Sequence, residues 1–363
     1  MARLNRAQAQ ELNRAKVLAA AQDEFTERGF RDAKIDAIAD RADLTRGAVY
    51  SNFPGKRALY LAVLADQAAH APTPPHAQPG TTRREALGTF ARAWVTRRAD
   101  QEALYRDLIP EIAADERIRR PYTQLMQLNA LLLALCLEQL EQQQKIGKPQ
   151  PRQVRQAETI LTMLHGADQT TAAAPGFIEP FDIVSACEQL AGLTLNDWWA
   201  PPHHTAMPRT TNQPWTPPAA QDAVRDRPTN ITGDGVVAVL GLHRLAAIED
   251  VARATQNATL VIVTHEPDEL GPLARLTLAE LGGCLRQAFP EEALPPLHVV
   301  CDETGTLAAA AGVPAVSNET EAAARIEAGR LVAYADGHGA GSAVTGERGS
   351  SRPATSRPSD TTP

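Results

Sequence analysis

Residues 33–56 carry the pattern that most limits how this chain can fold, because they combine two short helical segments with a tight turn. Ile35, Ile38 and Ala39 stand at positions i, i+3 and i+4, which puts them on one face of a helix. Thr45 follows the turn and suits the N-cap of a second helix, since its hydroxyl can accept a hydrogen bond from a free backbone N–H. Two helices joined in this way are typical of a helix-turn-helix, which lays its second helix in the major groove of DNA.

The same spacing fits an ordinary helical hairpin in an all-α enzyme, and the distribution of charge helps to weigh the two interpretations. The chain has 363 residues and a net charge of −7, which at first argues against nucleic-acid binding. Residues 1–60, however, hold 11 Lys and Arg against 8 Asp and Glu, a net charge of +3, so the rest of the chain carries −10. Positive charge gathered in one segment of an acidic chain is expected of a local phosphate-binding surface.

The segment from residue 15 to residue 64 resembles the DNA-binding domain of the tetracycline-repressor (TetR) family. The matching positions are apolar core residues and members of the turn and of the second helix. They are Val17, Leu18, Ala20, Ala21, Phe25, Gly29, Phe30, Ile35, Ile38, Ala39, Ala42, Leu44, Thr45, Arg46, Gly47, Ala48, Val49, Tyr50, Phe53, Lys56 and Leu59. The resemblance implies a helix-turn-helix head, residues 1–70, on a helical body that binds ligands and forms a homodimer.

Several positions depart from the family pattern. Asp43 replaces a glycine at a turn position that we expect to need a positive φ, which Asp tolerates better than most residues. Ala33 and Lys34 replace threonines, so we expect the cap of the first helix of the motif to come from Asp32. Asn52 stands where histidine is frequent, so the contacts with bases and phosphates can differ from those of relatives.

The predicted contacts with DNA lie in and around the second helix of the motif. Arg46 is an always-charged fork that can read guanine or hold a phosphate. Short side chains around it let the backbone approach the base edges, and Lys56 begins a helix whose free N–H groups favour a phosphate. The predicted set is Lys34, Thr45, Arg46, Gly47, Ala48, Tyr50, Ser51, Asn52 and Lys56.

Residues 82–199 read as helices throughout, with a long segment apolar on almost all sides between residues 125 and 137 that should be central. The resemblance implies that the last two helices, 152–171 and 181–195, pair with their symmetry mates, although a core within one chain would have the same pattern. Ligand-lining candidates are Trp94, Tyr105, Tyr122, Met126, Met163 and His165. Plain core packing is the more common reason for any one of them, because large apolar residues fill cores by default, and no Cys or carboxylate stands at metal-ligand spacing from His165.

Seven prolines between residues 200 and 232 predict a semi-extended linker. Beyond it, short apolar runs at 236–242, 258–266 and 297–302 alternate with helical patterns, and residues 321–337 read as a hairpin that turns at Glu327, Ala328 and Gly329. This order predicts an α/β layer domain with a mixed sheet over residues 233–340. Residues 341–363 are rich in Ser, Thr, Gly and Pro and read as a disordered tail.

The element order of this second domain resembles the thioredoxin and peroxiredoxin fold, yet the residues that would carry its chemistry are absent. After the first strand, where a reactive cysteine would stand, the chain reads Gly241, Leu242, His243, Arg244. We therefore expect a domain kept for binding or packing, with Cys301 as the remaining candidate for an oxidisable sensor and Cys284 open to the same question. The domain holds 15 Asp and Glu against 6 Lys and Arg across residues 233–343, which disfavours a second DNA site.

The sequence thus predicts a multidomain chain that is not an enzyme: an all-α TetR-like regulator followed by an α/β thioredoxin-like domain. We expect a homodimer that binds a near-palindromic operator in double-stranded DNA, acts as a repressor, and is released by an unidentified small-molecule effector. No cofactor or metal is predicted. Three features favour a reducing, cytoplasmic setting with no membrane contact. The four cysteines are scattered without paired spacing, the apolar runs are too short to span a bilayer, and the N-terminus is polar. The alternatives are a thiol-redox enzyme or redox-responsive regulator acting through the C-terminal domain, or an acidic protein-interaction module there.

Overall fold

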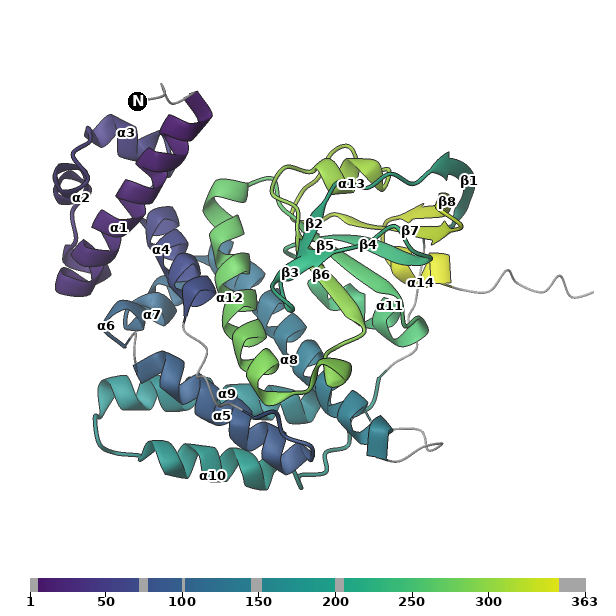
Figure 1. Cartoon of the computed structure of the whole chain (residues 1–363), viewed down its shortest axis with the longest axis horizontal. Coiled ribbons are helices and arrows are strands. Elements are labelled where there is room, and N and C mark those ends of the chain that lie inside the picture. The colour runs from purple at the N-terminus through teal and green to yellow at the C-terminus, as the bar shows by residue number, and fades with distance from the viewer. Residues whose placement is uncertain (1–5, 72–77, 100–101, 145–151, 200–205, 346–363) are drawn as a thin grey trace, which may run out of the picture.

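The computed structural model describes residues 6–71, 78–99, 102–144, 152–199 and 206–345 of the chain. Within these residues, ten helices form the N-terminal half, and a six-stranded mixed sheet with its own helices forms the C-terminal half (Figure 1). The expected order of an all-helical part followed by an α/β part with a mixed sheet is confirmed.

The head consists of four helices that share one small apolar core. They are α1 (Arg6–Asp32), α2 (Ile35–Arg41), α3 (Arg46–Tyr50) and α4 (Lys56–His70). Phe25, Ile38, Val49 and Leu59 meet in that core with almost no exposed surface. Gly29 adopts φ 74°, so α1 changes direction just before α2 begins.

The helical body surrounds a long central helix, as the apolar pattern predicted. Its helices are α5 (Arg83–Ala99), α6 (Glu102–Tyr105), α7 (Leu108–Ala113), α8 (Glu116–Gln144), α9 (Val154–Ala173) and α10 (Pro180–Leu190). Leu125, Leu128, Leu132 and Leu137 of α8 are fully buried. Because α5 and α9 both pack against α8, and α10 covers α5, the body is layered around α8.

The six-stranded sheet has the order β1-β8-β7-β4-β5-β6. Its strands are β1 (Arg209–Pro214), β4 (Gly235–Gly241), β5 (Ala258–Val263), β6 (Leu297–Cys301), β7 (Glu321–Glu327) and β8 (Arg330–Asp336). Strands β4, β5 and β6 run parallel, whereas β7, β8 and β1 are antiparallel to their neighbours. Every residue of β5 is buried, as expected of a parallel strand covered on both faces.

The remaining C-terminal elements cover the sheet or connect its strands. They are β2 (Ala220–Asp222), β3 (Arg227–Thr229), η1 (Leu245–Ala247), α11 (Ile248–Ala254), α12 (Pro267–Ala288), η2 (Glu291–Ala293), α13 (Thr306–Ala310) and α14 (Ala340–Thr345). The β7–β8 hairpin turns at Ala328 and Gly329, with φ of 48° and 69°. Two consecutive positive φ values define the tight turn that matches the twist of a hairpin, so the turn predicted from Glu327, Ala328 and Gly329 is where it was expected.

Two segments differ from the sequence-based expectation. Residues 209–229 were expected to belong to a linker but carry β1, β2 and β3. Strand β1 pairs with β8 at the edge of the sheet. An edge strand tolerates Pro214, which has no backbone N–H to donate, because its outer side has no neighbouring strand. The expected disordered tail, 341–363, begins inside α14, whose Ala343 and Val344 are buried. The other parts of these segments, residues 200–205 and 346–363, lie outside the described residues.

Helix α12 joins the two halves of the chain. It connects β5 to β6, yet it packs along α4, α5 and α8 of the helical half (Figure 1). Its leucines, from Leu270 to Leu285, are buried on all sides. Ion pairs between the two halves add to this packing: Arg117–Glu266 at 2.6 Å, Arg120–Glu319 at 2.8 Å, Arg152–Glu249 at 2.6 Å and Arg253–Glu138 at 3.2 Å.

No helix in the described part of the chain is both long and apolar enough to cross a bilayer.

Candidate DNA interface and candidate ligand cavity

The turn between α2 and α3 is built by two side chains that the sequence singled out. Asp43 adopts φ 53°, the left-handed conformation expected where relatives have glycine. The Thr45 hydroxyl accepts a hydrogen bond from the Ala48 N–H at 3.2 Å, so Thr45 caps α3 as predicted. The cap of α2 differs from the expectation: Lys34 is its N-cap and makes no side-chain cap bond, while the Lys34 N–H donates to Glu24 at 3.3 Å. Asp32 therefore does not cap this helix.

Helix α3 buries one side and presents the other to solvent. Val49 faces the core of the head, whereas Lys34, Thr45, Arg46, Gly47, Tyr50 and Ser51 are exposed. Ala48, Asn52 and Lys56 are partly buried. The fold thus brings most of the predicted DNA-contacting side chains to one exposed region around α3.

Arg46 is held in place by its neighbours without being buried. Its guanidinium lies 3.3 Å from the carboxylate of Asp36 and 5.5 Å from the centre of the Tyr50 ring. A hydrogen bond with Tyr50, followed by the charge of Asp36, raises the pKa of Arg46. An exposed ion pair of this kind is weak, so Arg46 can exchange Asp36 for a phosphate or a base edge.

Two polar residues after Arg46, together with Arg14 of α1, fix the end of α3. Ser51 donates to the Ala48 carbonyl at 2.9 Å, and the Asn52 amide donates to the same carbonyl at 2.8 Å. Arg14 of α1 donates to the Asn52 carbonyl at 3.3 Å and lies over the Phe53 ring. Arg14 is a cation next to this region that the sequence reasoning missed, because nothing in the pattern of α1 distinguishes it from a solvated arginine.

Lys56 has a structural partner in addition to its predicted role. Its ammonium donates to the Arg31 carbonyl at 3.0 Å and lies 4.8 Å from the centre of the Phe30 ring. Partial burial lowers the pKa of Lys56, although nearby carboxylates such as that of Glu111 oppose the shift. The side chain ties the end of α1 to the start of α4, at the helix N-terminus where we expected a phosphate.

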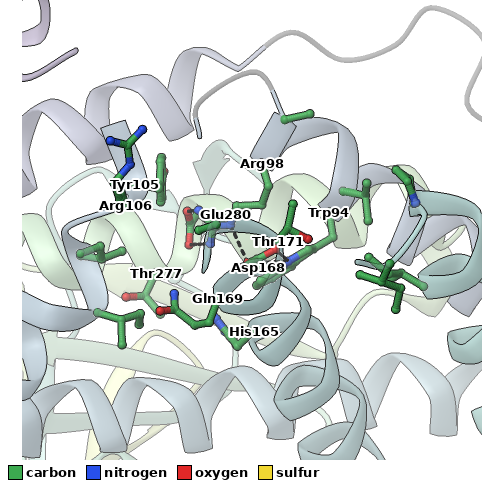
Figure 2. Close-up of a pocket in the computed structure, with 18 of the residues that line it drawn as sticks. Trp94, Arg98, Tyr105, Arg106, His165, Asp168, Gln169, Thr171, Thr277 and Glu280 are labelled. Carbon is green, nitrogen blue, oxygen red and sulfur yellow. Dashed lines mark hydrogen bonds and ion pairs between the residues drawn. The ribbon is translucent and has the colours of Figure 1, made fainter. Parts of the chain in front are cut away.

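A cavity of about 340 Å³ lies between α5, α8, α9 and α12. This volume is within the range of small-molecule sites. Its wall contains aromatic residues and a small set of charged and polar side chains, many of which are labelled in Figure 2. Trp94, Tyr105, Tyr122 and His165 of the six predicted ligand-lining residues surround this cavity.

The two predicted methionines lie elsewhere. Met163 is on the outer side of α9, beside Thr159, Thr162 and Leu195, and Met126 packs at the margin of the hydrophobic core. Both stand on helices that line the cavity, so helical spacing alone did not distinguish their direction. A ligand-binding role for any of the six residues stays a prediction.

A charged triad forms one side of the cavity (Figure 2). The Arg98 guanidinium donates to both carboxylate oxygens of Glu280, at 2.6 and 3.0 Å, and through Nε to Asp168 at 3.0 Å. The indole N–H of Trp94 donates to Asp168 as well, at 3.0 Å, and the Tyr105 ring lies 4.2 Å from the guanidinium carbon. The sequence reasoning missed this triad, since its members come from three helices and are separated by 70 and 182 residues.

Burial shifts the pKa values of two groups in the cavity wall, Asp168 and His165. Burial raises the pKa of Asp168 to about 6, although the charge of Arg98 opposes the shift. Burial, with the charge of Arg98 second, lowers the pKa of His165 to about 4, so this imidazole is neutral near pH 7. Among the described residues no group of three or more His, Cys, Asp or Glu side chains is arranged to hold a metal ion.

The head therefore has the construction of a helix-turn-helix DNA-binding domain: a short, capped helix on an exposed surface, fixed to a compact helical core. Residues 17–63 match the model of the bacterial regulatory proteins of the tetR family. The chain thus carries the N-terminal DNA-binding domain of the tetR family of transcriptional regulators at these residues.

Curated relatives match short stretches of the chain. The HTH-type transcriptional regulator SrpR of Pseudomonas putida is 45% identical over 67 residues, which are 18% of this chain and 31% of the relative. The HTH-type transcriptional activator FasR of Mycolicibacterium smegmatis is 45% identical over 51 residues, or 14% of this chain and 23% of the relative. The chain therefore spans less than half the length of these relatives.

Solved structures match about half of the chain at low similarity. NalD of Pseudomonas aeruginosa, the secondary repressor of the MexAB-OprM multidrug efflux pump, is 22% identical with a TM-score of 0.35, and the match covers 52% of this chain and 99% of that one. A TetR-like regulator from Rhodococcus sp. RHA1 is 22% identical with a TM-score of 0.32, covering 52% and 96%.

Proposed function

We propose that this protein is a dimeric transcriptional repressor, which binds a near-palindromic DNA operator through α3 and is released by a small molecule bound in the cavity of the helical body. The observation that carries the proposal is the exposed, capped α3 inside a segment that matches the tetR family. Repression is what the family resemblance implies, and the setting would be the cytoplasm, where the chain meets DNA.

Two copies of α3 would enter successive major grooves about 34–36 Å apart. Arg46 would read guanine or hold a phosphate, Tyr50 and Asn52 would contact phosphates, and Lys56 would add a charge at the start of α4. The short side chains of Gly47, Ala48 and Ser51 would allow close approach.

The proposed dimer interface is the outer surface of α9 and α10. Phe177 and Phe181, next to the start of α10, are 75% and 77% exposed, and large apolar side chains with that exposure favour a protein partner. The outer side of α9 carries the small residues Thr159 and Gly166, which permit a close approach of two helices.

The release step requires a ligand that binds the two conformations of the dimer unequally, because a ligand with equal affinity for both shifts nothing. The cavity adjoins α5 and α12, and α12 packs along α4, the last helix of the head. A ligand that moves these helices would change the distance between the two heads.

We further propose that the C-terminal half has a thioredoxin-like fold used for packing and binding. Supporting this, the parallel strands β4 and β5 adjoin the antiparallel hairpin of β7 and β8. The redox alternative is disfavoured because burial raises the pKa of Cys301 to about 11 and of Cys284 to about 12, and a thiol needs to ionise to attack a disulfide or a peroxide.

The test is a gel shift at fixed salt with a duplex that the wild-type protein selects from a random pool. Arg46→Ala and Tyr50→Phe should weaken binding, whereas Arg330→Ala should leave it unchanged, because Arg330 is a partly exposed arginine that pairs within the C-terminal sheet. Unchanged binding by Arg46→Ala and Tyr50→Phe would remove the mechanism. Transcription from a template that carries the selected site would show whether the protein represses or activates.

A further inference from the structure

One wall of the cavity comes from α12, a helix of the C-terminal half. Leu276, Thr277 and Glu280 line the cavity, and their spacing of one and four residues places them on one side of the helix. Asn129 of α8 donates to the Thr277 carbonyl at 3.5 Å, so α12 is joined to the opposite wall as well. A ligand in the cavity would touch both halves of the chain.

The partly buried charges of the cavity lining do not balance. Arg98 is the partly buried cation of the described lining, with 17% of its side chain exposed, while Asp168 and Glu280, with 19% and 15% exposed, contribute two carboxylates. The exposed lining charges, Arg106 and Glu179, offset each other. The described lining therefore has one negative charge in excess when both carboxylates are ionised, and a buried charge without a full partner is unfavourable.

Each nitrogen of Arg98 already donates to a carboxylate: both terminal nitrogens donate to Glu280, and Nε donates to Asp168. An anionic ligand would add a further negative charge beside these two carboxylates, whereas a cationic ligand would balance the excess.

The side chain of Asn129 is a second, independent observation that points to a ligand in the cavity. Its side chain is 97% buried and lines the cavity, and its Oδ1 has no hydrogen-bond partner in the described structure. A buried acceptor without a partner costs free energy that a ligand donor would recover. The cavity therefore combines hydrogen-bond acceptors, an excess of carboxylate charge and aromatic walls. A site of this composition suits an apolar molecule that carries a protonated amine.

We propose that the cavity is a composite site of the helical body and α12, and that it selects an apolar ammonium ligand through Asp168, Asn129 and the α12 residue Glu280. This inference rests on the proposed function and deepens it, because it gives the effector a chemical class and makes the C-terminal half part of the effector site.

The position of α12 also gives the ligand a route to the head. The Arg97 guanidinium donates to the Ala68 carbonyl near the end of α4, at 3.3 Å, and lies so close to Gly283 of α12 that a Cβ there would stand 2.1 Å from an Arg97 nitrogen. A shift of α12 would disturb this contact between α5 and α4.

The test uses three naphthalene probes of similar size and different charge: 2-naphthylmethylamine, 2-naphthylmethanol and 2-naphthoate. Titration calorimetry on the full chain at pH 7.5 should give the ammonium probe about tenfold or more higher affinity than the alcohol, the ratio expected of a charge-assisted hydrogen bond. Equal affinity for the carboxylate and the ammonium probes, or no binding of any probe at millimolar concentration, would overturn the proposal.

Glu280→Gln tests the contribution of α12, and Glu269→Gln is the matched control on the same helix, where Glu269 lies 3.7 Å from Arg117. Glu280→Gln should lower the affinity for the ammonium probe about tenfold and leave that for the alcohol unchanged, while Glu269→Gln should change neither. An equal loss for both probes in Glu280→Gln would overturn the role of its charge. If Glu280→Gln does not fold, Asp168→Asn gives the same comparison from α9.

Binding of DNA by the same preparations keeps this inference separate from the proposed function. A protein that binds its selected duplex but shows no preference for the ammonium probe contradicts the composite site alone. A protein that binds no duplex contradicts the proposed function, whatever the probes do.

Discussion

Tyr60 and Tyr50 allow the two roles of the head, stability and DNA contact, to be separated with one type of substitution. Tyr60 of α4 is 1% exposed, and its hydroxyl donates to the Leu104 carbonyl of α6 at 2.6 Å. Burial raises the pKa of Tyr60, so the hydroxyl remains a donor. Tyr60→Phe keeps the ring contacts with Phe25 and Phe30 but leaves the Leu104 carbonyl without this buried donor.

The loss should cost about 1–3 kcal/mol of the free energy of unfolding, the usual price of an unsatisfied buried polar group. Tyr50 is 42% exposed, so Tyr50→Phe should change stability by less than about 0.5 kcal/mol. Urea unfolding followed by circular dichroism measures both values. The effects on affinity for the selected duplex should be the opposite of those on stability. Folded Tyr60→Phe should bind the duplex as the wild-type protein does, and Tyr50→Phe should bind it more weakly. A stability loss in Tyr50→Phe that equals that of Tyr60→Phe would refute this reasoning.

Three further predictions concern the turn, the sheet and the cavity. Thr45→Ala removes the cap of α3 and should cost about 1 kcal/mol in urea unfolding; no loss would mean that the bond to Ala48 contributes nothing. A Cβ on Gly241 would stand 2.4 Å from backbone oxygens of the loop before β7, whereas one on Gly233 meets nothing within 4 Å. Gly241→Ala should therefore lower the melting temperature and Gly233→Ala should not, and equal melting temperatures would contradict the close approach.

The third of these predictions concerns pH. Asp168, with its pKa raised to about 6, is faced by Arg98 and Trp94 of α5, by Glu280 of α12 and by His165 of its own helix. A bound ammonium favours ionised Asp168, so binding releases a proton, and the affinity for 2-naphthylmethylamine should rise between pH 5 and pH 7.5. Calorimetry at the two pH values that gives equal affinities would count against the role of Asp168.

Local features of the fold were predictable because single residues determine them. Asp43 in a left-handed turn, Thr45 as a cap and the turn at Ala328 and Gly329 all follow from backbone preferences that act within a few residues. The parallel strands were readable because each is a short apolar run; β5 is an example.

Features that depend on long-range packing were not predictable. Helix α12 carries a broad apolar surface, which indicates a largely buried helix but not which neighbours bury it. β1 is polar at an edge and ends in Pro214, so its sequence resembles a linker. In the cavity, Arg98, Asp168 and Glu280 meet only through the tertiary fold, and Met163 points away from a cavity that its neighbour His165 on α9 lines.

The central claim is that two copies of α3 occupy major grooves of one duplex. Asp40 of α2 is exposed and is not among the proposed DNA contacts, so Asp40→Cys can carry a tethered iron–EDTA group that cleaves nearby DNA. The wild-type chain treated with the same reagent is the control, since Cys136, Cys187 and Cys284 are buried and Cys301 is partly so. On the selected duplex the account predicts two clusters of cleavage, centred in major grooves about one helical turn apart. A single cluster, or cleavage no greater than in the control, would contradict it.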